Sequence, residues 1–358
     1  MAYIEVHVNR IIENIEKLNN LLYNQNKSWT LVQKVLGSNY SVIKEILKSE
    51  AITKLHSIGD SHLSGLKAVK EINSRIQTLY IKPPALAYVK DVVKYADISL
   101  NTAINTIKAL NEEAKKLGKI HKIIIMIEMG ELREGVLRDN ILSFYESVFN
   151  MPNIHVVGLG TNLGCMFGVQ PSYDKLLQLC LYRQLIEVKF NQKLDIVSGG
   201  TSITMPLIND NKIPNEINHF RLGEASFLGI SPLDNKQFRN LNTNTFEFKS
   251  YIVELRKKDA EPDGVISNAN VGSTSDIPLT KQSFRAILDF GSLDVNPDYL
   301  KPKDDDVQFF GNSSDMTVYD LKDNKFNLKE GDTLTFNVNY MGVANIMNSR
   351  FVDKEIIL

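Results

Sequence analysis

Short apolar runs alternate with amphipathic stretches along the first two thirds of this chain. Eight runs, such as "WTLVQKVL" and "KIIIMIEMG", have the length of a strand and are followed by turn residues. Between them, segments such as residues 106–119 and 172–190 repeat apolar residues at helical spacing. Strands that alternate with helices predict parallel βαβ units, and eight such units predict a (β/α)8 barrel. The predicted strands lie in residues 29–36, 54–60, 77–83, 97–101, 122–130, 156–162, 194–200 and 219–229.

The pattern changes after about Pro232. Several strand-like segments with turn residues between them, such as "TFEFKSYIVELRKKDA" and "GDTLTFNVNYMGVANI", then follow one another, which indicates a mostly β domain. The fold class predicted is α/β, with an N-terminal (β/α)8 TIM barrel over residues 9–232 and a C-terminal β domain over residues 233–358. Residues 1–8 are expected to pair with the second domain. A doubly wound open sheet is the alternative, but no glycine-rich dinucleotide turn follows the first strand.

Composition narrows the classes of function. The 358 residues carry a formal net charge of −1, so no large basic field favours nucleic acid. Two cysteines, Cys165 and Cys180, do not make a disulfide framework. The N-terminal segment lacks the apolar core of a signal peptide, and no apolar run has the length of a membrane-spanning helix. We therefore expect a soluble cytoplasmic protein without nucleic-acid or membrane partners.

Lys34 lies inside the first apolar run. A lysine in a buried strand costs free energy unless its amine is paired, reaches solvent or is used chemically. The active sites of (β/α)8 barrels lie at the C-terminal ends of the strands, and Lys34 is near the end of the first one. Two interpretations follow. The amine either reaches solvent, or it forms a Schiff base and is activated by desolvation.

The segment "SGGTS", residues 198–202, adds a candidate phosphate site. Its glycines allow backbone N–H groups to approach an anion, and Thr201 and Ser202 add hydroxyls at a predicted helix start. Loops after the seventh and eighth strands of such barrels commonly bind phosphate. A phosphate site and a lysine in one barrel mouth suggest pyridoxal 5'-phosphate (PLP), whose pyridine nitrogen faces an arginine or an aspartate. Arg221, in "RLGEA", is the candidate, although a structural ion pair with Glu224 is the alternative.

Five features in order strengthen this interpretation: Lys34, "IEMGELREG", "GTNLGC", "SGGTS" and "NHFRLGEASFLG". Together they resemble the alanine racemase superfamily, the fold-type III PLP enzymes, and most closely its alanine/ornithine racemase branch. The resemblance implies that Lys34 binds PLP and is the catalytic base on one face, and that Arg221 meets the pyridine nitrogen. Arg133 matches the arginine on the phenolic-oxygen side of the cofactor. The other cofactor-binding positions that it implies are Asn162, Thr201, Ser202, Gly223, Glu224 and Tyr340.

The second catalytic base is not assigned by the resemblance. Alanine racemases carry a tyrosine in a "GYADG"-like motif of the partner's β domain, and "DFGSLDV" places Ser292 at that position here. A serine is a poor base without help. Asp294 and Asp315 in the β domain, and Cys165 in the barrel, are the other candidates. The resemblance also implies a head-to-tail homodimer.

We therefore predict a PLP-dependent amino-acid racemase that interconverts L- and D-amino acids by two-base proton transfer at Cα. Its substrate is alanine or a basic amino acid such as ornithine. One alternative is a non-catalytic PLP-binding homeostasis protein, but these generally stop after the barrel. Another is a fold-type III amino-acid decarboxylase, but these prefer an acidic partner at the pyridine nitrogen. The histidines show no metal-ligand spacing, so no metal site is predicted.

Overall fold

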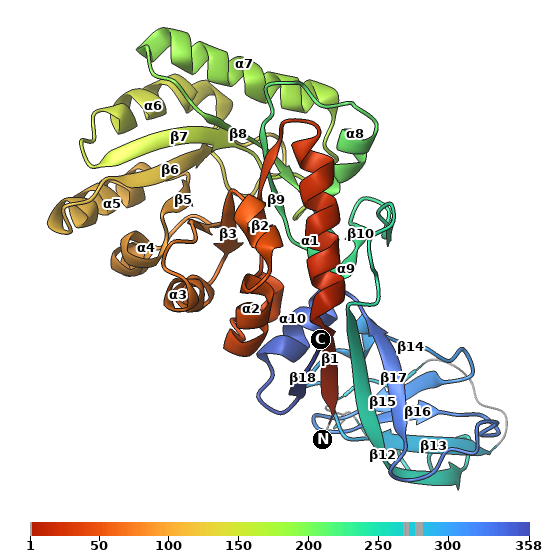
Figure 1. The fold of residues 1–358 in the computed structure, drawn as a ribbon. Coiled ribbons are helices and arrows are strands. Elements are labelled where there is room, and N and C mark those ends of the chain that lie inside the picture. The colour runs from red at the N-terminus through yellow and green to blue at the C-terminus, as the bar shows by residue number, and fades with distance from the viewer. Residues whose placement is uncertain (1, 268, 270–271, 276–281) are drawn as a thin grey trace. The chain divides into compact units, whose positions relative to one another are not determined.

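Eight parallel strands close into a barrel (Figure 1). The computed structural model describes residues 2–267, 269, 272–275 and 282–358. Each barrel strand overlaps one of the eight predicted runs, and the first and last strands are hydrogen-bonded to each other. The predicted fold class, a TIM barrel followed by a mostly β region, is confirmed. The barrel strands are β2 (Ser28–Val32), β3 (Ser57–Asp60), β4 (Thr78–Tyr80), β5 (Ile98–Asn101), β6 (His121–Met126), β7 (Ile154–Gly160), β8 (Ile196–Thr201) and β9 (His219–Leu222).

Helices lie outside the barrel and connect successive strands (Figure 1). Strands buried on both faces need such cover, which is why they read as nearly continuous apolar runs in the sequence. The α-helices of this part are α1 (Val8–Tyr23), α2 (Tyr40–Leu47), α3 (Leu63–Ile72), α4 (Val89–Tyr95), α5 (Ile104–Lys116), α6 (Ile141–Phe149), α7 (Tyr173–Phe190), α8 (Met205–Asn209) and α9 (Glu224–Leu228). Short 3-10 helices are η1 (Lys34–Leu36), η2 (Glu50–Lys54), η3 (Leu86–Tyr88), η4 (Arg138–Asn140) and η5 (Ser202–Thr204).

Helix α7 shows how local sequence sets an element. Ser172 caps its N-terminus by accepting a hydrogen bond from the Lys175 N–H, and Asn191 ends it in the left-handed conformation. Leu176 and Cys180 are buried as their spacing predicts. Leu181 and Leu185, which share that spacing in the sequence, are instead about half exposed, at 53% and 48%. The buried face is completed by Leu179 and Ile186.

Lys34 does not lie in a strand, contrary to the way its apolar run reads. Strand β2 ends at Val32, and the Gln33 N–H still bonds the Gly59 carbonyl of β3 at 2.9 Å. Lys34 then begins the 3-10 helix η1, in which Val35 and Leu36 are buried and Lys34 itself is exposed. The apolar run is continuous because a buried strand passes directly into a buried turn.

A sheet of eight strands forms most of the remaining chain (Figure 1). The long strand β12 is central, since it pairs with three other strands and contains an irregularity between Ile252 and Glu254. Phe248, Phe290 and Phe336 meet in its core, with ring centroids 5.0 to 6.1 Å apart. The strands are β1 (Tyr3–His7), β12 (Phe246–Lys258), β13 (Ser283–Leu288), β14 (Leu300–Pro302), β15 (Gln308–Asn312), β16 (Thr317–Asp320), β17 (Thr333–Val338) and β18 (Asp353–Ile357); η6 (Pro297–Tyr299), α10 (Tyr340–Asn348) and the hairpin β10 (Ile230–Ser231) and β11 (Lys236–Gln237) complete the described elements.

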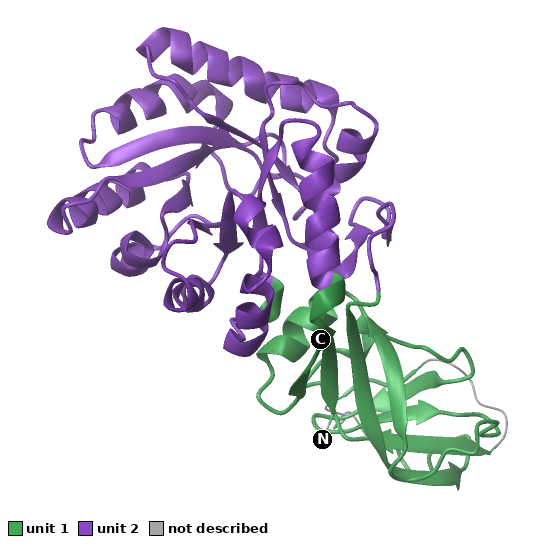
Figure 2. Cartoon of the chain, viewed as in Figure 1, with its two compact units in different colours: residues 1–10, 35–37, 244–358 green, residues 11–34, 38–243 purple. Residues whose placement is uncertain are grey.

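The chain divides into two compact units (Figure 2). The barrel unit comprises residues 11–34 and 38–243, and the β unit comprises residues 1–10, 35–37 and 244–358. Strand β1 joins the β unit by pairing antiparallel with β12 and parallel with β18. The predicted domain boundary at residues 232 and 233 stays a prediction. In the described part of the chain, no helix combines the length and the apolar character that crossing a membrane requires.

Candidate active site

The predicted barrel residues gather where the parallel strands end. Lys34 follows β2, Asn162 follows β7, Thr201 ends β8 and Arg221 lies in β9. Strands β2 and β9 are direct neighbours, with Thr30 opposite Arg221 in the register. The C-terminal ends of all parallel strands in a barrel face one side, which is where barrel enzymes place their catalytic groups.

Arg221 is a buried cation bound to neutral groups. Only 3% of its surface is exposed. Its guanidinium donates to the Ser198 hydroxyl of β8, to the Thr161 carbonyl at 2.8 Å, and to the side-chain oxygen of Asn162. Burial lowers the pKa of Arg221 to about 10, so that it remains a cation at neutral pH. The predicted alternative, an ion pair between Arg221 and Glu224, is not found among the described residues, because the hydrogen bonds of Arg221 all go to uncharged acceptors.

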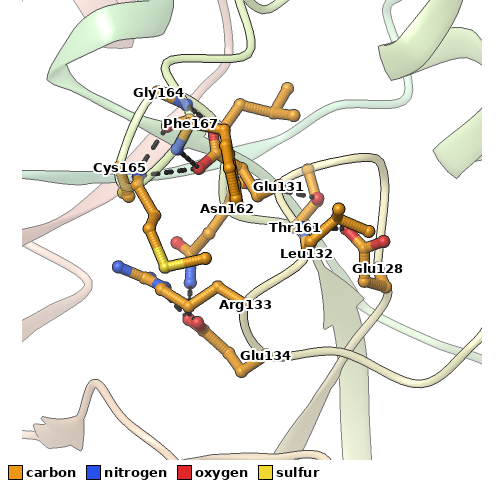
Figure 3. A network of polar contacts seen from close by, with 12 residues as sticks. Glu128, Glu131, Leu132, Arg133, Glu134, Thr161, Asn162, Gly164, Cys165 and Phe167 are labelled. Carbon is orange, nitrogen blue, oxygen red and sulfur yellow. Dashed lines mark hydrogen bonds and ion pairs between the residues drawn. The ribbon is translucent and has the colours of Figure 1, made fainter.

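Arg133 lies in the loop after β6 and forms an ion pair with its neighbour in sequence, Glu134 (Figure 3). Its Nη2 donates to the carboxylate Oε1 of Glu134 at 2.6 Å, and its Nε donates to the other oxygen. The amide nitrogen of Asn162 also donates to Glu134. Asn162 therefore connects the two arginines, because its oxygen accepts from Arg221 and its nitrogen reaches the partner of Arg133. The pKa of Arg133 is raised, chiefly by the hydrogen bond to Glu134.

Glu128, in the same loop, does not pair with Arg133, which bonds Glu134 instead. The carboxylate Oε1 of Glu128 accepts the backbone N–H groups of Gly130 at 2.6 Å and Leu132 at 3.2 Å (Figure 3). A second carboxylate, that of Glu131, is 2% exposed and accepts four backbone N–H groups from residues 164–169. The two glutamates hold the loops after β6 and β7, and Cys165 lies on the second of these loops with an exposed thiol.

The predicted phosphate-binding residues come together at the ends of β8 and β9. The Ser202 hydroxyl oxygen accepts the backbone N–H groups of Gly223 at 3.3 Å and of Ala225 at 3.2 Å. Gly200 has φ +119°, and a Cβ there would lie 2.6 Å from the Thr204 hydroxyl oxygen, so the backbone requires glycine. Burial raises the pKa of Glu224, and the positive charge of Lys34 opposes that rise.

These barrel residues fit PLP. Hydroxyl and backbone N–H groups at residues 202, 223 and 225 suit a phosphate, and the Lys34 amine suits its aldehyde. Arg221 brings a positive charge to the strand ends, and its uncharged acceptors on Ser198, Thr161 and Asn162 do not neutralise it. An anionic cofactor with an acceptor nitrogen complements that arrangement.

The remaining predicted residues lie in the β unit. Tyr340 is half-buried at the start of α10, where the Asn339 side chain caps the helix by accepting from the Gly342 N–H. Ser292, Asp294 and Asp315 occupy two adjacent turns, since the Ser292 N–H bonds the Ser313 carbonyl at 3.0 Å. Asp294 accepts from the Gly291 N–H at 3.2 Å and from the Ser349 hydroxyl at 3.0 Å. Asp315 is exposed and accepts from the Ser314 hydroxyl at 2.6 Å.

Three residues of this site were not predicted from the sequence: Ser198, Glu131 and Glu134. Ser198 lies two residues before Gly200 on β8, so the period of a strand could have placed both on one face of the barrel wall. Glu131 and Glu134 belong to "GELREG", where nothing distinguishes a carboxylate that binds a distant loop from one that faces solvent. Their roles depend on contacts with residues 162–169, which the linear pattern does not show.

Comparison with known proteins identifies the family of this chain. The family model described as alanine racemase, N-terminal domain, matches residues 6–232. The chain is 34% identical over 359 residues to an ornithine racemase of Acetoanaerobium sticklandii, covering 99% of both chains, and 28% identical over 297 residues to a lysine racemase of Thermotoga maritima, covering 83% of both. A solved alanine racemase from Bartonella henselae with covalently bound pyridoxal phosphate shares the fold, with a TM-score of 0.73, 14% identity and 99% of each chain covered. The chain belongs to the alanine racemase family.

Proposed function

We propose that this protein racemises a basic amino acid, of the size and charge of ornithine or lysine. It is a PLP-dependent amino-acid racemase. The preference for a basic substrate is supported by two relatives that are named ornithine racemase and lysine racemase, the first of them similar over the full length of the chain. Alanine, the other substrate that the sequence left open, is the comparison substrate in the test.

One observation carries the assignment of the site. The cation of Arg221 is buried on β9, is bound by three neutral acceptors, and lies on the strand next to the one that Lys34 follows. We propose that Lys34, Arg133, Asn162, Thr201, Ser202, Arg221, Gly223, Glu224 and Tyr340 hold the cofactor.

PLP, when bound, makes the Cα proton of an attached amino acid acidic. In our proposal, the Lys34 amine takes or returns that proton on one face of Cα. Arg221 would donate a hydrogen bond to the pyridine nitrogen and keep its own proton, because a guanidinium does not lose it at neutral pH. The ring nitrogen consequently stays an acceptor, which favours proton transfer over decarboxylation.

Racemisation needs a second base on the opposite face of Cα. We propose that it comes from the turns that carry Ser292, Asp294 and Asp315, supplied by a second copy of the chain in a head-to-tail homodimer. Both oxygens of Asp294 already accept hydrogen bonds within the β unit, whereas Ser292 and Asp315 are exposed. Cys165, exposed on the loop after β7, is the barrel candidate. The predicted cytoplasmic location is part of the same proposal.

The test is hydrogen exchange at Cα in D₂O with the purified protein and a panel of free amino acids. We expect exchange and loss of chirality with ornithine or lysine, faster than with alanine. Lys34→Ala should lose both the reaction and the visible absorbance of bound PLP. Absorbance without exchange for any amino acid would favour the non-catalytic PLP-binding protein, and release of carbon dioxide would favour the decarboxylase.

Single substitutions then identify the second base. Ser292→Ala, Asp294→Asn, Asp315→Asn and Cys165→Ala are each assayed from both enantiomers. The variant that lacks the second base is expected to lose Cα hydrogen exchange from one enantiomer before the other. The other enantiomer presents its Cα proton to Lys34, which is still intact. If none of the four variants lowers turnover in either direction, the second base lies elsewhere.

A further inference from the structure

A chain of hydrogen bonds runs from Arg221 through the barrel interior. Arg221 donates to the Ser198 hydroxyl, and that hydroxyl lies 3.0 Å from Nδ1 of His219. The other ring nitrogen of His219, Nε2, lies 2.9 Å from the Thr30 hydroxyl, which lies 2.7 Å from the Ser57 hydroxyl. Ser198, His219, Thr30 and Ser57, here called the barrel relay, come from the four neighbouring strands β8, β9, β2 and β3.

Every member of the barrel relay is buried. Ser198, His219 and Thr30 have no exposed surface, and Ser57 has 2%. Buried polar groups are hydrogen-bonded in folded proteins because an unpaired one costs free energy. The hydrogens of the relay must therefore be distributed so that each of its hydrogen bonds has one donor and one acceptor.

The arginine fixes the direction of the relay. A guanidinium has donors and no acceptor, so the Ser198 oxygen must accept from Arg221. Among the described residues, the Ser198 hydroxyl has no further hydrogen-bond partner, so its single hydrogen is directed to His219 Nδ1, which is then unprotonated. A neutral imidazole in this position carries its hydrogen on Nε2 and donates it to Thr30, whose own hydrogen goes to Ser57.

We infer that His219 is a positioning residue for Arg221: as the neutral Nε2–H tautomer it accepts the Ser198 hydrogen and so makes Ser198 an acceptor for the guanidinium. The inference rests on the proposed role of Arg221 at the cofactor and goes beyond it. The ring nitrogens of His219 contact Ser198 and Thr30, neither of which is a predicted cofactor-binding residue. His219 therefore reaches Arg221 only through Ser198.

The surroundings of His219 keep it neutral. Burial lowers its pKa well below the ordinary value, and the charges of His56 and Arg221 act in the same direction. His56 packs against the His219 ring with centroids 4.8 Å apart, and Arg221 is two residues further along β9. A protonated His219 would place two cations on either side of Ser198, and the Ser198 hydrogen would lose its acceptor.

The barrel contains a matched control. His121, on β6, is 3% exposed, and its Nε2 lies 2.8 Å from the Ser99 hydroxyl of β5. In the described part of the chain, this second buried serine–histidine pair makes no hydrogen bond to Arg221. A substitution at His121 therefore removes an equivalent buried imidazole without touching the barrel relay.

The first experiment uses the wild-type holoenzyme labelled with ¹⁵N-histidine. Long-range ¹H–¹⁵N correlation spectra distinguish the two neutral tautomers from the imidazolium, and the signal of His219 is identified by its loss in His219→Asn. We expect the neutral Nε2–H pattern between pH 6 and 9. An Nδ1–H tautomer, or an imidazolium at pH 7, overturns the inference. This readout is independent of catalysis, so it stands even if no amino acid is racemised.

The second experiment asks whether His219 acts through Ser198. His219→Leu and Ser198→Ala are expected to change the pH dependence of the visible absorbance of bound PLP in the same way and to lower kcat/KM by about tenfold to a hundredfold. The double variant should be no worse than either single one, because both substitutions interrupt the same path of hydrogen bonds from Arg221 through Ser198 to His219. His219→Asn, whose side-chain oxygen can replace Nδ1, should stay within about threefold of the wild type.

His121→Leu is the control and should leave the absorbance and its pH dependence unchanged. Independent, multiplying effects of His219→Leu and Ser198→Ala would overturn the inference, and so would an equal change in His121→Leu. If His219→Leu does not fold, Ser198→Ala and the wild-type tautomer still decide the question.

Discussion

The Glu131 carboxylate offers a sharp test of how the loops at the barrel mouth are held. Its Oε1 accepts the N–H groups of Gly164 at 2.7 Å and Val169 at 2.8 Å, and its Oε2 accepts those of Met166 at 2.7 Å and Phe167 at 3.1 Å. Glu131→Gln keeps the shape but offers one oxygen. Two of the four N–H groups would then face the amide NH₂, which is itself a donor.

The magnitude follows from the number of bonds lost. A hydrogen bond to a charged acceptor contributes roughly 1.5–3 kcal/mol. Water replaces part of this at Met166 and Phe167, which are 54% and 66% exposed. We therefore expect Glu131→Gln to destabilise the loop by about 2–3 kcal/mol, which corresponds to amide hydrogen exchange about 30- to 150-fold faster at residues 164–169.

Glu128→Gln is the matched control. Glu128 also accepts two backbone N–H groups, but both go to its Oε1, so the single oxygen of a glutamine can replace it. Exchange at residues 130–132 should change by less than about threefold. If Glu131→Gln leaves the exchange of residues 164–169 at the wild-type rate, the carboxylate does not hold the loop and the reasoning is wrong.

The pH dependence of the same loop has a definite sign. Burial alone would raise the pKa of Glu131, but the four backbone donors outweigh it and the net pKa is lowered from 4.5. A carboxyl whose pKa is depressed by folding stabilises fully above its unfolded pKa, and this contribution is lost as the pH falls through the folded pKa. Protection of residues 164–169 should therefore decrease below about pH 4.5 in the wild type, whereas Glu131→Gln should lack that decrease.

Three further predictions concern the cofactor residues and the β unit. Arg221→Lys should weaken PLP binding by at least about tenfold in an absorbance titration, because one ammonium cannot reproduce the fork that reaches three acceptors; binding as in the wild type would contradict it. Gly200→Ala should also weaken PLP binding, because its Cβ would lie 2.6 Å from the Thr204 oxygen at a φ of +119°. Gly168→Ala is the control for the cost of a left-handed backbone alone, because nothing lies within 4 Å of its Cβ. Arg285→Ala should destabilise the β unit by about 3–5 kcal/mol in denaturant unfolding, because it leaves the buried Asp320 carboxylate, 2.6 Å from Arg285, without its cation; an unchanged midpoint would show that the pair is not needed.

The barrel was predictable because its strands are buried on both faces. Runs such as "KIIIMIEMG" are nearly continuously apolar, and the eight runs are separated by helical patterns, so element type and order follow from periodicity. The exact end of β2 was not predictable, because Val35 and Leu36 are as buried in η1 as Leu31 is in the strand. A hydropathy pattern reports burial, and it does not distinguish a strand from the turn after it.

The chemistry was predictable only in part. Lys34 and Arg221 stand out because a charge in an apolar run has few structural explanations. Glu134 and Ser198 do not stand out, because their partners Asn162 and Arg221 lie more than 20 residues along the chain. Only the pairing of neighbouring strands brings these residues within hydrogen-bond distance. Helix α7 gives the same lesson for packing: Leu181 and Leu185 fit the apolar period but remain exposed.

The pairing of β2 with β9 has a consequence for the order of folding. These strands lie near the two ends of the barrel sequence, and their hydrogen bonds, from Ser28 with His219 to Leu31 with Leu222, close the circle. Contacts between segments so distant in the chain form late, because the entropy of closing the long intervening loop opposes them. Arg221 lies in β9, and Lys34 directly follows β2. During synthesis, Lys34 therefore leaves the ribosome long before Arg221 does. Tight binding of the cofactor, which in our proposal needs both residues, would indicate a completed barrel.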